Sequence, residues 1–275
     1  NDVLQVANRI FEHLKSPIRI NNEDIYISTS IGIVMIDSTY QTAEDVLRDA
    51  DVTMGNLEGV LLDEGGTPKT CRDPKVCYVF KSPTRYVQNL VAAGFDVMSL
   101  ANNHAGDFGD TGRKSTMKAL EDAGIAHAGQ LQQKTTIFTR NGIRFGFVAF
   151  APNSNCVPLN NIEGAKQLVA GLDSVADIVI VSFHGGAEGP QHERVPRTTE
   201  YFHGENRGDV YAFAHAVIDA GADIVFGHGP HVVRAVEVYK NRFIAYSLGN
   251  FCTYGGINVS GINGNCVIET LSYAV

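Results

Sequence analysis

Apolar residues recur along this chain with two spacings, and the two alternate from residue 52 onward. Short, nearly continuous apolar runs of strand length lie at residues 52–54, 95–100, 178–183 and 224–226. Between them, apolar residues recur at helical spacing over residues 82–93, 110–122, 162–172 and 210–220. Strands that alternate with helices of this size predict an α/β sheet with helices on its faces.

Two further pairs of strands are expected. Residues 135–139 and 144–150 flank Asn141-Gly142, which is a strong signal for a hairpin turn. Residues 232–239 and 242–247 have the same strand-like composition. For the helix over residues 82–93, Ser82 is the expected N-cap, with Pro83 in its first turn.

The first fifty residues have a pattern of their own. Apolar residues at helical spacing run from Val3 to Leu14, and Pro17 ends this helix. Residues 25–36 alternate and predict a strand. Thr42 is the expected N-cap of a short helix that runs to about residue 50.

The composition bears on which partners and which membrane segments can be expected. The apolar content is 44%, the charged content 19% and the formal net charge −8. No run of Lys and Arg is present, so we expect no nucleic-acid partner. No apolar run of 18 residues is visible either, so no signal or transmembrane segment is expected in this chain. The five cysteines include Cys71 and Cys77 around a short Pro-containing loop, which form a local disulfide or remain free thiols.

Polar clusters follow four of the predicted strands directly. They are Gly55-Asn56-Leu57-Glu58, Asn102-Asn103-His104, His184 to Glu188, and Gly227-His228-Gly229-Pro230-His231. Ligands of open α/β sheets gather at the carboxyl ends of strands. Each cluster taken alone is also compatible with ordinary turn chemistry or a semi-buried histidine. Four clusters of the same kind at four strand ends favour one shared metal or phosphate site.

The donor types indicate the metal. Imidazole nitrogen, carboxylate and amide oxygen together suit Zn, Mn or Fe better than Ca or Mg. We therefore predict one or two divalent ions at this edge of the sheet.

Five sequence segments resemble those of the CapA family of poly-γ-glutamate capsule synthesis proteins, in their order and spacing. They are DVTMGNLEG, FDVMSLANNHAGDFGDTG, VIVSFHGGAE, GADIVFGHGPHVVRAVEVY and FIAYSLGNF. The resemblance covers about residues 51–275. It implies a calcineurin-like metallophosphoesterase fold, a β-sandwich flanked by helices with two metals between the sheets.

The resemblance also implies roles for individual residues. His104 and Asn103 are the expected catalytic residues, with His104 as general acid or donor to a phosphate oxygen. The expected metal ligands are Asn56, Glu58, Asn103, His184, His228 and His231. Asn250 is expected to line the pocket. Glu188 and Asp107 either orient the imidazoles or are surface charges.

Residues 1–53 resemble the C-terminal part of a GGDEF (diguanylate cyclase) domain, without its signature loop. The two resemblances predict a fused or chimeric chain. A GGDEF-like helix–strand–helix would occupy residues 1–53, and a CapA-like domain would occupy residues 54–275. The strand predicted within this GGDEF-like segment is expected to supply the first strand of the β-sandwich. Ile33 then stands where metallophosphoesterases of this type carry a metal-binding Asp.

Three functions remain open at this point, and the last of them is a regulatory module derived from the GGDEF-like segment, which lacks the signature loop. The first is a metal-dependent hydrolase of the CapA type, acting on a phosphoester or a cell-envelope bond. The second is a non-catalytic accessory protein that binds an anionic polymer such as poly-γ-glutamate, with a degenerate metal site. Candidate polymer contacts are Arg194, Arg197, Arg207 and Arg234. The family implies capsule synthesis machinery at the extracytoplasmic face of a bacterial membrane; the oligomeric state is left open.

Overall fold

The computed structural model describes residues 18–20, 23–25, 47, 50–71, 77–251 and 260–264. The chain divides into a unit of residues 51–268 and a unit of residues 1–50 with 269–275, and each is described by itself. In the second of these, β1 (Ile18–Ile20) and β2 (Glu23–Ile25) pair in antiparallel fashion. The predicted helix over residues 3–14, the Thr42 cap, Ile33 and most of the predicted strand over residues 25–36 lie outside the described residues.

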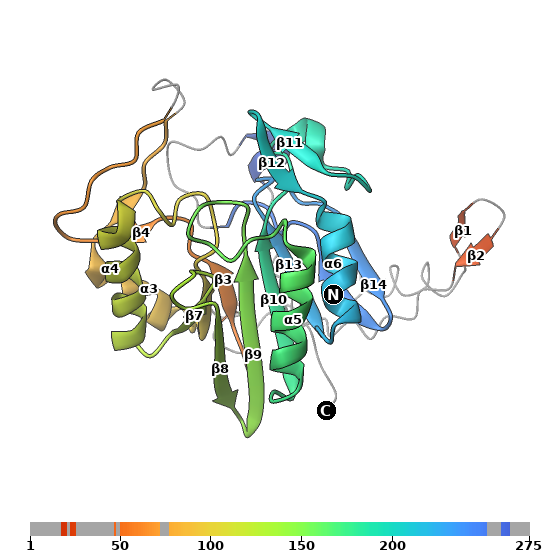
Figure 1. The fold of residues 1–275 in the computed structure, drawn as a ribbon, viewed down its shortest axis with the longest axis horizontal. Coiled ribbons are helices and arrows are strands. Elements are labelled where there is room, and N and C mark those ends of the chain that lie inside the picture. The colour runs from red at the N-terminus through yellow and green to blue at the C-terminus, as the bar shows by residue number, and fades with distance from the viewer. Residues whose placement is uncertain are drawn as a thin grey trace, which may run out of the picture. The chain divides into compact units, whose positions relative to one another are not determined.

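A six-stranded sheet forms the centre of the larger unit (Figure 1). Its order is β14 (Val236–Tyr239), β15 (Arg242–Ala245), β13 (Ile224–His228), β10 (Ile178–His184), β9 (Ile143–Phe150) and β8 (Thr135–Arg140). The four inner strands run parallel, and the two edge strands are antiparallel to their neighbours. Every residue of β10 is buried, which explains its continuous apolar run, because both faces of this strand are covered.

Helices α5 (Ile162–Asp173) and α6 (Val210–Asp219) cover one face of this sheet. Asn161 and Asp209 cap them by accepting backbone hydrogen bonds from Gly164 and Ala212, which explains where each helix begins. The main core lies between these helices and the sheet, around fully buried side chains such as Phe150, Phe183 and Phe213. The predicted hairpin is also confirmed: Asn141 and Gly142 both have positive φ and join β8 to β9.

A second sheet of three parallel strands lies beside β8 and β9. It contains β3 (Met54–Asn56), β6 (Val97–Ser99) and β7 (Ala126–Ala128). Helices α3 (Val87–Ala92) and α4 (Gly109–Asp122) pack with it around Leu120. A Cβ added at Gly129 would lie 2.8 Å from Cβ of Ala101 and 3.0 Å from Cβ of Ala149, so the two sheets meet closely there. The predicted α/β class, with sheets flanked by helices, is confirmed.

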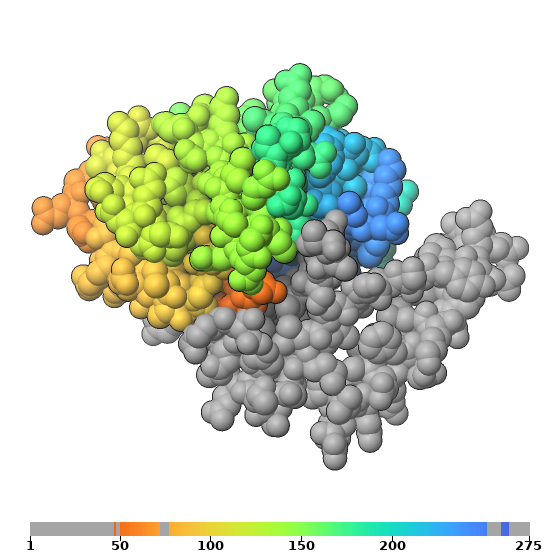
Figure 2. All heavy atoms as spheres, turned by 90° about the horizontal axis from the view of Figure 1, so that it is seen from below, coloured from red at the N-terminus to blue at the C-terminus, as the bar shows by residue number. Residues whose placement is uncertain are grey.

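Smaller elements complete the unit. The parallel pair β4 (Val60–Leu61) and β5 (Lys81–Ser82) follows β3, and the hairpin β11 (Glu200–Phe202) and β12 (Glu205–Gly208) precedes α6. Short 3-10 turns lie at Thr84–Tyr86, Pro190–His192 and Gly261–Gly264. Figure 2 shows residues of the first half gathered at one end of this unit and those of the second half at the other. Among the described residues, no helix has the length and apolarity needed to span a membrane.

The predicted N-cap at Ser82 is wrong. Ser82 belongs to β5, where its carbonyl accepts from the backbone of Leu62 at 2.9 Å. The turn begins instead after Pro83, and Asp63 accepts from both the backbone and the hydroxyl of Thr84. Pairing with β4 therefore overrides the local capping preference.

A buried ion pair holds the loop that follows β10. Arg234 donates to both carboxylate oxygens of Glu200 at 2.9 and 2.8 Å, and to the carbonyl of Ala187 at 2.9 Å. Both side chains are at most 5% exposed. Removing one partner would leave a buried charge without compensation, which is far more costly than losing an exposed pair.

We therefore predict that Glu200→Gln lowers the free energy of unfolding by about 3–5 kcal/mol. Asp177→Asn is the matched control, since Asp177 pairs with Arg144 at the surface and its loss should cost less than about 1 kcal/mol. Urea denaturation followed by circular dichroism measures both. Equal losses in the two variants would contradict the role given to burial.

Candidate functional site

The parallel register of the strands brings the predicted clusters to one edge. His184 and His228 are paired neighbours at the last positions of β10 and β13. In the smaller sheet, Asn56 ends β3 opposite Ser99 of β6, and the Asn102-Asn103-His104 segment follows directly. The two sheets therefore present the same kinds of side chain from their carboxyl ends, as the sequence predicts.

Glu58 lies between side chains of both sheets. Its carboxylate is 3.9 Å from Nδ1 of His184 and 3.7 Å from Nε2 of His231. Asn56 donates to it at 3.1 Å, and Asn56 in turn accepts from Asn102 at 3.0 Å. All four predicted clusters are thus joined through Glu58, and strand register places His228 beside His184.

Several donor atoms here are buried and have no hydrogen-bond partner among the described residues. They are both ring nitrogens of His184, Nε2 of His228, Oε1 of Glu58 and Oδ1 of Asn103. Leaving such atoms unpaired costs about 1–3 kcal/mol each, so a native site that keeps them has a use for them.

Electrostatics keeps both strand-end histidines neutral. Burial, followed by the nearby His231 and Arg207, lowers the pKa of His184 well below its ordinary value. Burial also lowers the pKa of His228 to about 4. Neutral imidazole is the form that binds metals. Burial raises the pKa of Glu58, against the opposing effect of the neighbouring His231 and His104.

His231 is held in an unusual backbone conformation. Its φ is +57°, a region that costs energy for residues other than glycine. Its Nδ1 lies 2.8 Å from Oδ1 of Asn250, which can only accept, so Nδ1 donates to Asn250 and Nε2 faces Glu58. The amide of Asn250 also donates to the carbonyls of His231 and Asn263. Asn250 therefore orients His231.

The donor set fits a divalent metal in kind. Unpaired imidazole nitrogens, a carboxylate and amide oxygens converge there, and these are ligands for Zn, Mn or Fe. Within the described ranges, however, no three His, Cys, Asp or Glu side chains lie close enough together to hold one ion. The described residues therefore supply suitable donor atoms. Their His, Cys, Asp and Glu side chains alone, however, do not complete a ligand set for one ion.

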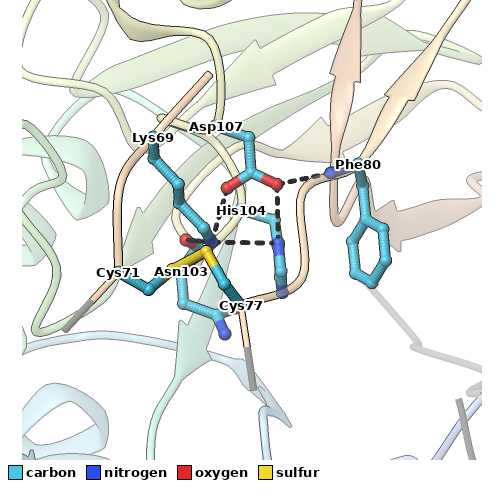
Figure 3. Close-up of a disulfide and its surroundings, with 7 residues drawn as sticks. All are labelled: Lys69, Cys71, Cys77, Phe80, Asn103, His104 and Asp107. Atoms are coloured by element: carbon cyan, nitrogen blue, oxygen red, sulfur yellow. Dashed lines mark hydrogen bonds and ion pairs between the residues drawn. A yellow bond between two sulfur atoms is a disulfide. The ribbon is translucent and has the colours of Figure 1, made fainter. Parts of the chain in front are cut away.

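A second arrangement adjoins this one, around the buried carboxylate of Asp107 (Figure 3). Asp107 lies 2.8 Å from Nδ1 of His104 and 2.6 Å from Nζ of Lys69, and it accepts from the backbone of Phe80 at 2.6 Å. Burial would raise the pKa of Asp107, but the hydrogen bonds from His104 and Lys69 outweigh it and lower the pKa. Of the two alternatives left open for Asp107, the structure favours a buried, ionised orienting group over a surface charge.

This network assigns the proton on His104. Because Asp107 only accepts and is nearer than Lys69, Nδ1 of His104 is the protonated nitrogen. Nε2 is then free to face a ligand. The ring of Phe80 packs against the imidazole with centroids 4.2 Å apart, which fixes its plane.

The disulfide between Cys71 and Cys77 is present and sits beside this network (Figure 3). Lys69 lies two residues before Cys71, and Phe80 lies three residues after Cys77. The disulfide thus links the two segments of the chain that contact Asp107, one through Lys69 and the other through Phe80. Sequence analysis missed Lys69 and Phe80, because neither belongs to a strand-end cluster; the pair of cysteines was the available signal.

Other predicted residues have different surroundings. Glu188 pairs with Arg207 at 2.9 Å. Among the described residues, no hydrogen bond joins Glu188 to an imidazole. Arg207 and Arg234 are buried and ion-paired within the chain, so they are not the free surface contacts considered for a polymer. Arg194 and Arg197 are exposed.

The sequence matches the family "Bacterial capsule synthesis protein PGA_cap" over residues 9–254. Capsule biosynthesis protein CapA of Bacillus anthracis is 28% identical over 86% of this chain and 62% of its own length. PGA biosynthesis protein CapA of Bacillus subtilis is 26% identical over 85% of this chain and 65% of its own length. The chain therefore spans about three fifths of these relatives. The match begins within residues 1–53, and none of these similarities supports the GGDEF resemblance of that segment.

Solved structures are more distant. A hypothetical protein from Thermus thermophilus has a TM-score of 0.48 at 19% identity, covering 78% of this chain and 71% of its own. A 5′-nucleotidase precursor from the same organism has a TM-score of 0.33 at 14% identity, covering 59% and 32%. Both scores are low, so the fold stands on the sheet topology described above.

We predict that replacing Cys71 and Cys77 together by Ser lowers the free energy of unfolding by about 2 kcal/mol, because a short closed loop is opened in the unfolded chain. Denaturant titration measures the loss, and reduction of the wild-type chain should reproduce it. Peptide mapping without reductant should show the peptides of Cys71 and Cys77 linked. Free thiols at both positions in the untreated protein would contradict the assignment.

Proposed function

This chain belongs to the bacterial capsule synthesis protein family PGA_cap, and from that membership we propose that its strand-end site is a divalent-metal centre for hydrolysis of a phosphoester or a related cell-envelope bond. One observation carries the proposal. Buried donor atoms of Glu58, His184 and His228 converge without partners among the described residues, beside an oriented His104.

The ligands in this proposal come from both sheets. Asn56, Glu58 and Asn103 end or follow strands of the smaller sheet, and His184, His228 and His231 end or follow strands of the larger one. When bound, a divalent metal supplies Lewis acidity toward an ester oxygen. The chain itself contributes the imidazoles of His184 and His228, held neutral by burial, and the carboxylate of Glu58, which lies between His184 and His231.

His104 is the proposed proton donor. Its Nδ1–H is held by Asp107, so Nε2 is the nitrogen that carries a proton to the leaving oxygen or donates to a phosphate oxygen. Asp107 stabilises the cationic ring that this role requires, and Phe80 keeps the ring in one orientation. Lys69 completes the charge balance around Asp107.

The names of the relatives suggest the setting. The Bacillus proteins are named for capsule and PGA biosynthesis, so we place this chain in capsule poly-γ-glutamate synthesis, at the extracytoplasmic face of a bacterial membrane. An anionic polymer is then the expected partner. The resemblance of residues 1–53 to a cyclase domain has no part in this proposal.

One observation favours the second candidate, a non-catalytic accessory protein. The described residues hold no three His, Cys, Asp or Glu side chains arranged for one ion. A chain that binds polymer without hydrolysing it would need no complete metal site. Metal stoichiometry and turnover together separate the two functions.

Bound metal is the first test. After reconstitution with Mn²⁺ or Zn²⁺, we expect at least one ion per chain by elemental analysis, and we expect His184→Ala and His228→Ala to lower this by half or more, because each removes an unpaired donor. His215→Ala is the control, since His215 lies on α6 and pairs with Glu237. Unchanged metal content in both site variants would refute the ligand assignment.

Turnover is the second test. With metal bound, the wild-type chain should hydrolyse bis(4-nitrophenyl) phosphate, and His104→Ala should lower kcat by about 10²- to 10⁴-fold, because the proton donor is lost. The metal content of this variant should stay unchanged. A metal-loaded wild-type chain without turnover would favour the accessory function.

A further inference from the structure

A polar cavity of about 530 Å³ lies beside the Asn102-Asn103 segment. This volume falls within the range of small-ligand sites. The residues that line it are Lys69, Asn102, Asn103, Gly106, Arg113, Pro152, Asn153, Ser154, Asn160, Glu205 and Asn206. Figure 3 shows two of them, Lys69 and Asn103, next to His104. The cavity therefore opens beside the proposed proton donor.

Arg113 is the most telling residue of the lining. It lies on α4, is 8% exposed, and has no hydrogen-bond partner for Nε among the described residues. Its Nη1 donates to Asp110 at 3.2 Å, but the side chain of Asp110 is 66% exposed and that pair is screened by water. A Cβ added at Gly106 would lie 2.2 Å from Nη2, so the guanidinium needs a glycine there.

The balance of charge in the lining is positive. Lys69 and Arg113 are its cations, and Glu205 is the one carboxylate among the described residues that line it. Glu205 already pairs with the buried Arg207 at 3.0 Å. Lys69 pairs with Asp107 and remains 26% exposed. An incompletely neutralised, buried guanidinium is a strong anchor for an oxyanion.

Amide groups make up most of the remaining wall. Five asparagines line the cavity, and Oδ1 of Asn103 and of Asn153 are buried without partners among the described residues. Amides donate and accept hydrogen bonds without adding charge. They suit the neutral amide or hydroxyl groups that neighbour an anionic group on a larger ligand.

We propose that this cavity is a binding subsite for the anionic group of the ligand, a carboxylate or a phosphate, with Arg113 as its principal cation and Lys69 as the link to His104. Only the claim that the bound ligand reaches His104 rests on the proposed function. Binding of the anion stands on the cavity itself.

Isothermal titration calorimetry on the full chain tests this with three probes: a γ-linked tetraglutamate, the same peptide with its carboxylates amidated, and glycerol phosphate. The wild-type chain should bind at least one anionic probe, and bind the amidated peptide about ten-fold more weakly or worse. Arg113→Gln should weaken the anionic probe about ten-fold or more, because the buried cation is lost.

Asn206→Asp is the second variant, chosen because it should fold normally. Asn206 is exposed, and its Oδ1 accepts from the backbone of Gly208, a bond that Asp preserves. The added negative charge in the cavity should weaken the anionic probe about five-fold. Asn89→Asp makes the same change on α3, outside the cavity lining, and should leave binding unchanged.

The results separate the sources and the two proposals. If only the peptide binds, and does so in an Arg113-dependent way, the anionic group is a carboxylate. If only glycerol phosphate binds in this way, the anionic group is a phosphate. Either result supports the subsite. No binding of either anion, or equal binding by the wild type, Arg113→Gln and Asn206→Asp, overturns it. His228→Ala should leave anion binding intact, so loss of metal or turnover there bears on the proposed function and not on the cavity.

Discussion

Parallel pairing of β10 with β13 is the constraint on which the rest of the site depends. Because the two strands run in the same direction and in register, His184 and His228 emerge side by side at the same edge. A Cβ added at Gly227 would lie 2.3 Å from the carbonyl oxygen of Tyr246, so the sheet admits only glycine between Phe226 and His228. The covered faces of the sheet make this register costly to change, since a shift of one residue would turn the buried side chains outward.

Burial at that edge sets the chemistry. Removing imidazoles from water disfavours their charged form, which is why the pKa values of His184 and His228 fall. It also makes unpaired donors expensive, and the described part of the chain leaves several of them unpaired around Glu58. The proposed metal site rests on these neutral nitrogen donors next to a carboxylate.

The Cys71–Cys77 disulfide acts at a different level. It links the segments that carry Lys69 and the Phe80 backbone to the carboxylate of Asp107. Through Asp107 it fixes the orientation of His104, and through Lys69 it contributes to the wall of the neighbouring cavity. The proposed proton donor, the proposed anion subsite and the strand-end donors are thereby positioned by separate parts of the chain.

The sequence by itself determined the alternation of strands and helices, the hairpin at Asn141-Gly142 and the strand-end positions of the candidate ligands, because these follow from local periodicity and turn chemistry. Ser82 shows the limit of local reasoning, since pairing with a distant strand decided its role. Only the tertiary structure placed Lys69 against Asp107 and Arg113 in the cavity wall. Such contacts join residues dozens of positions apart through packing, and no short-range pattern encodes which charges will share a buried volume.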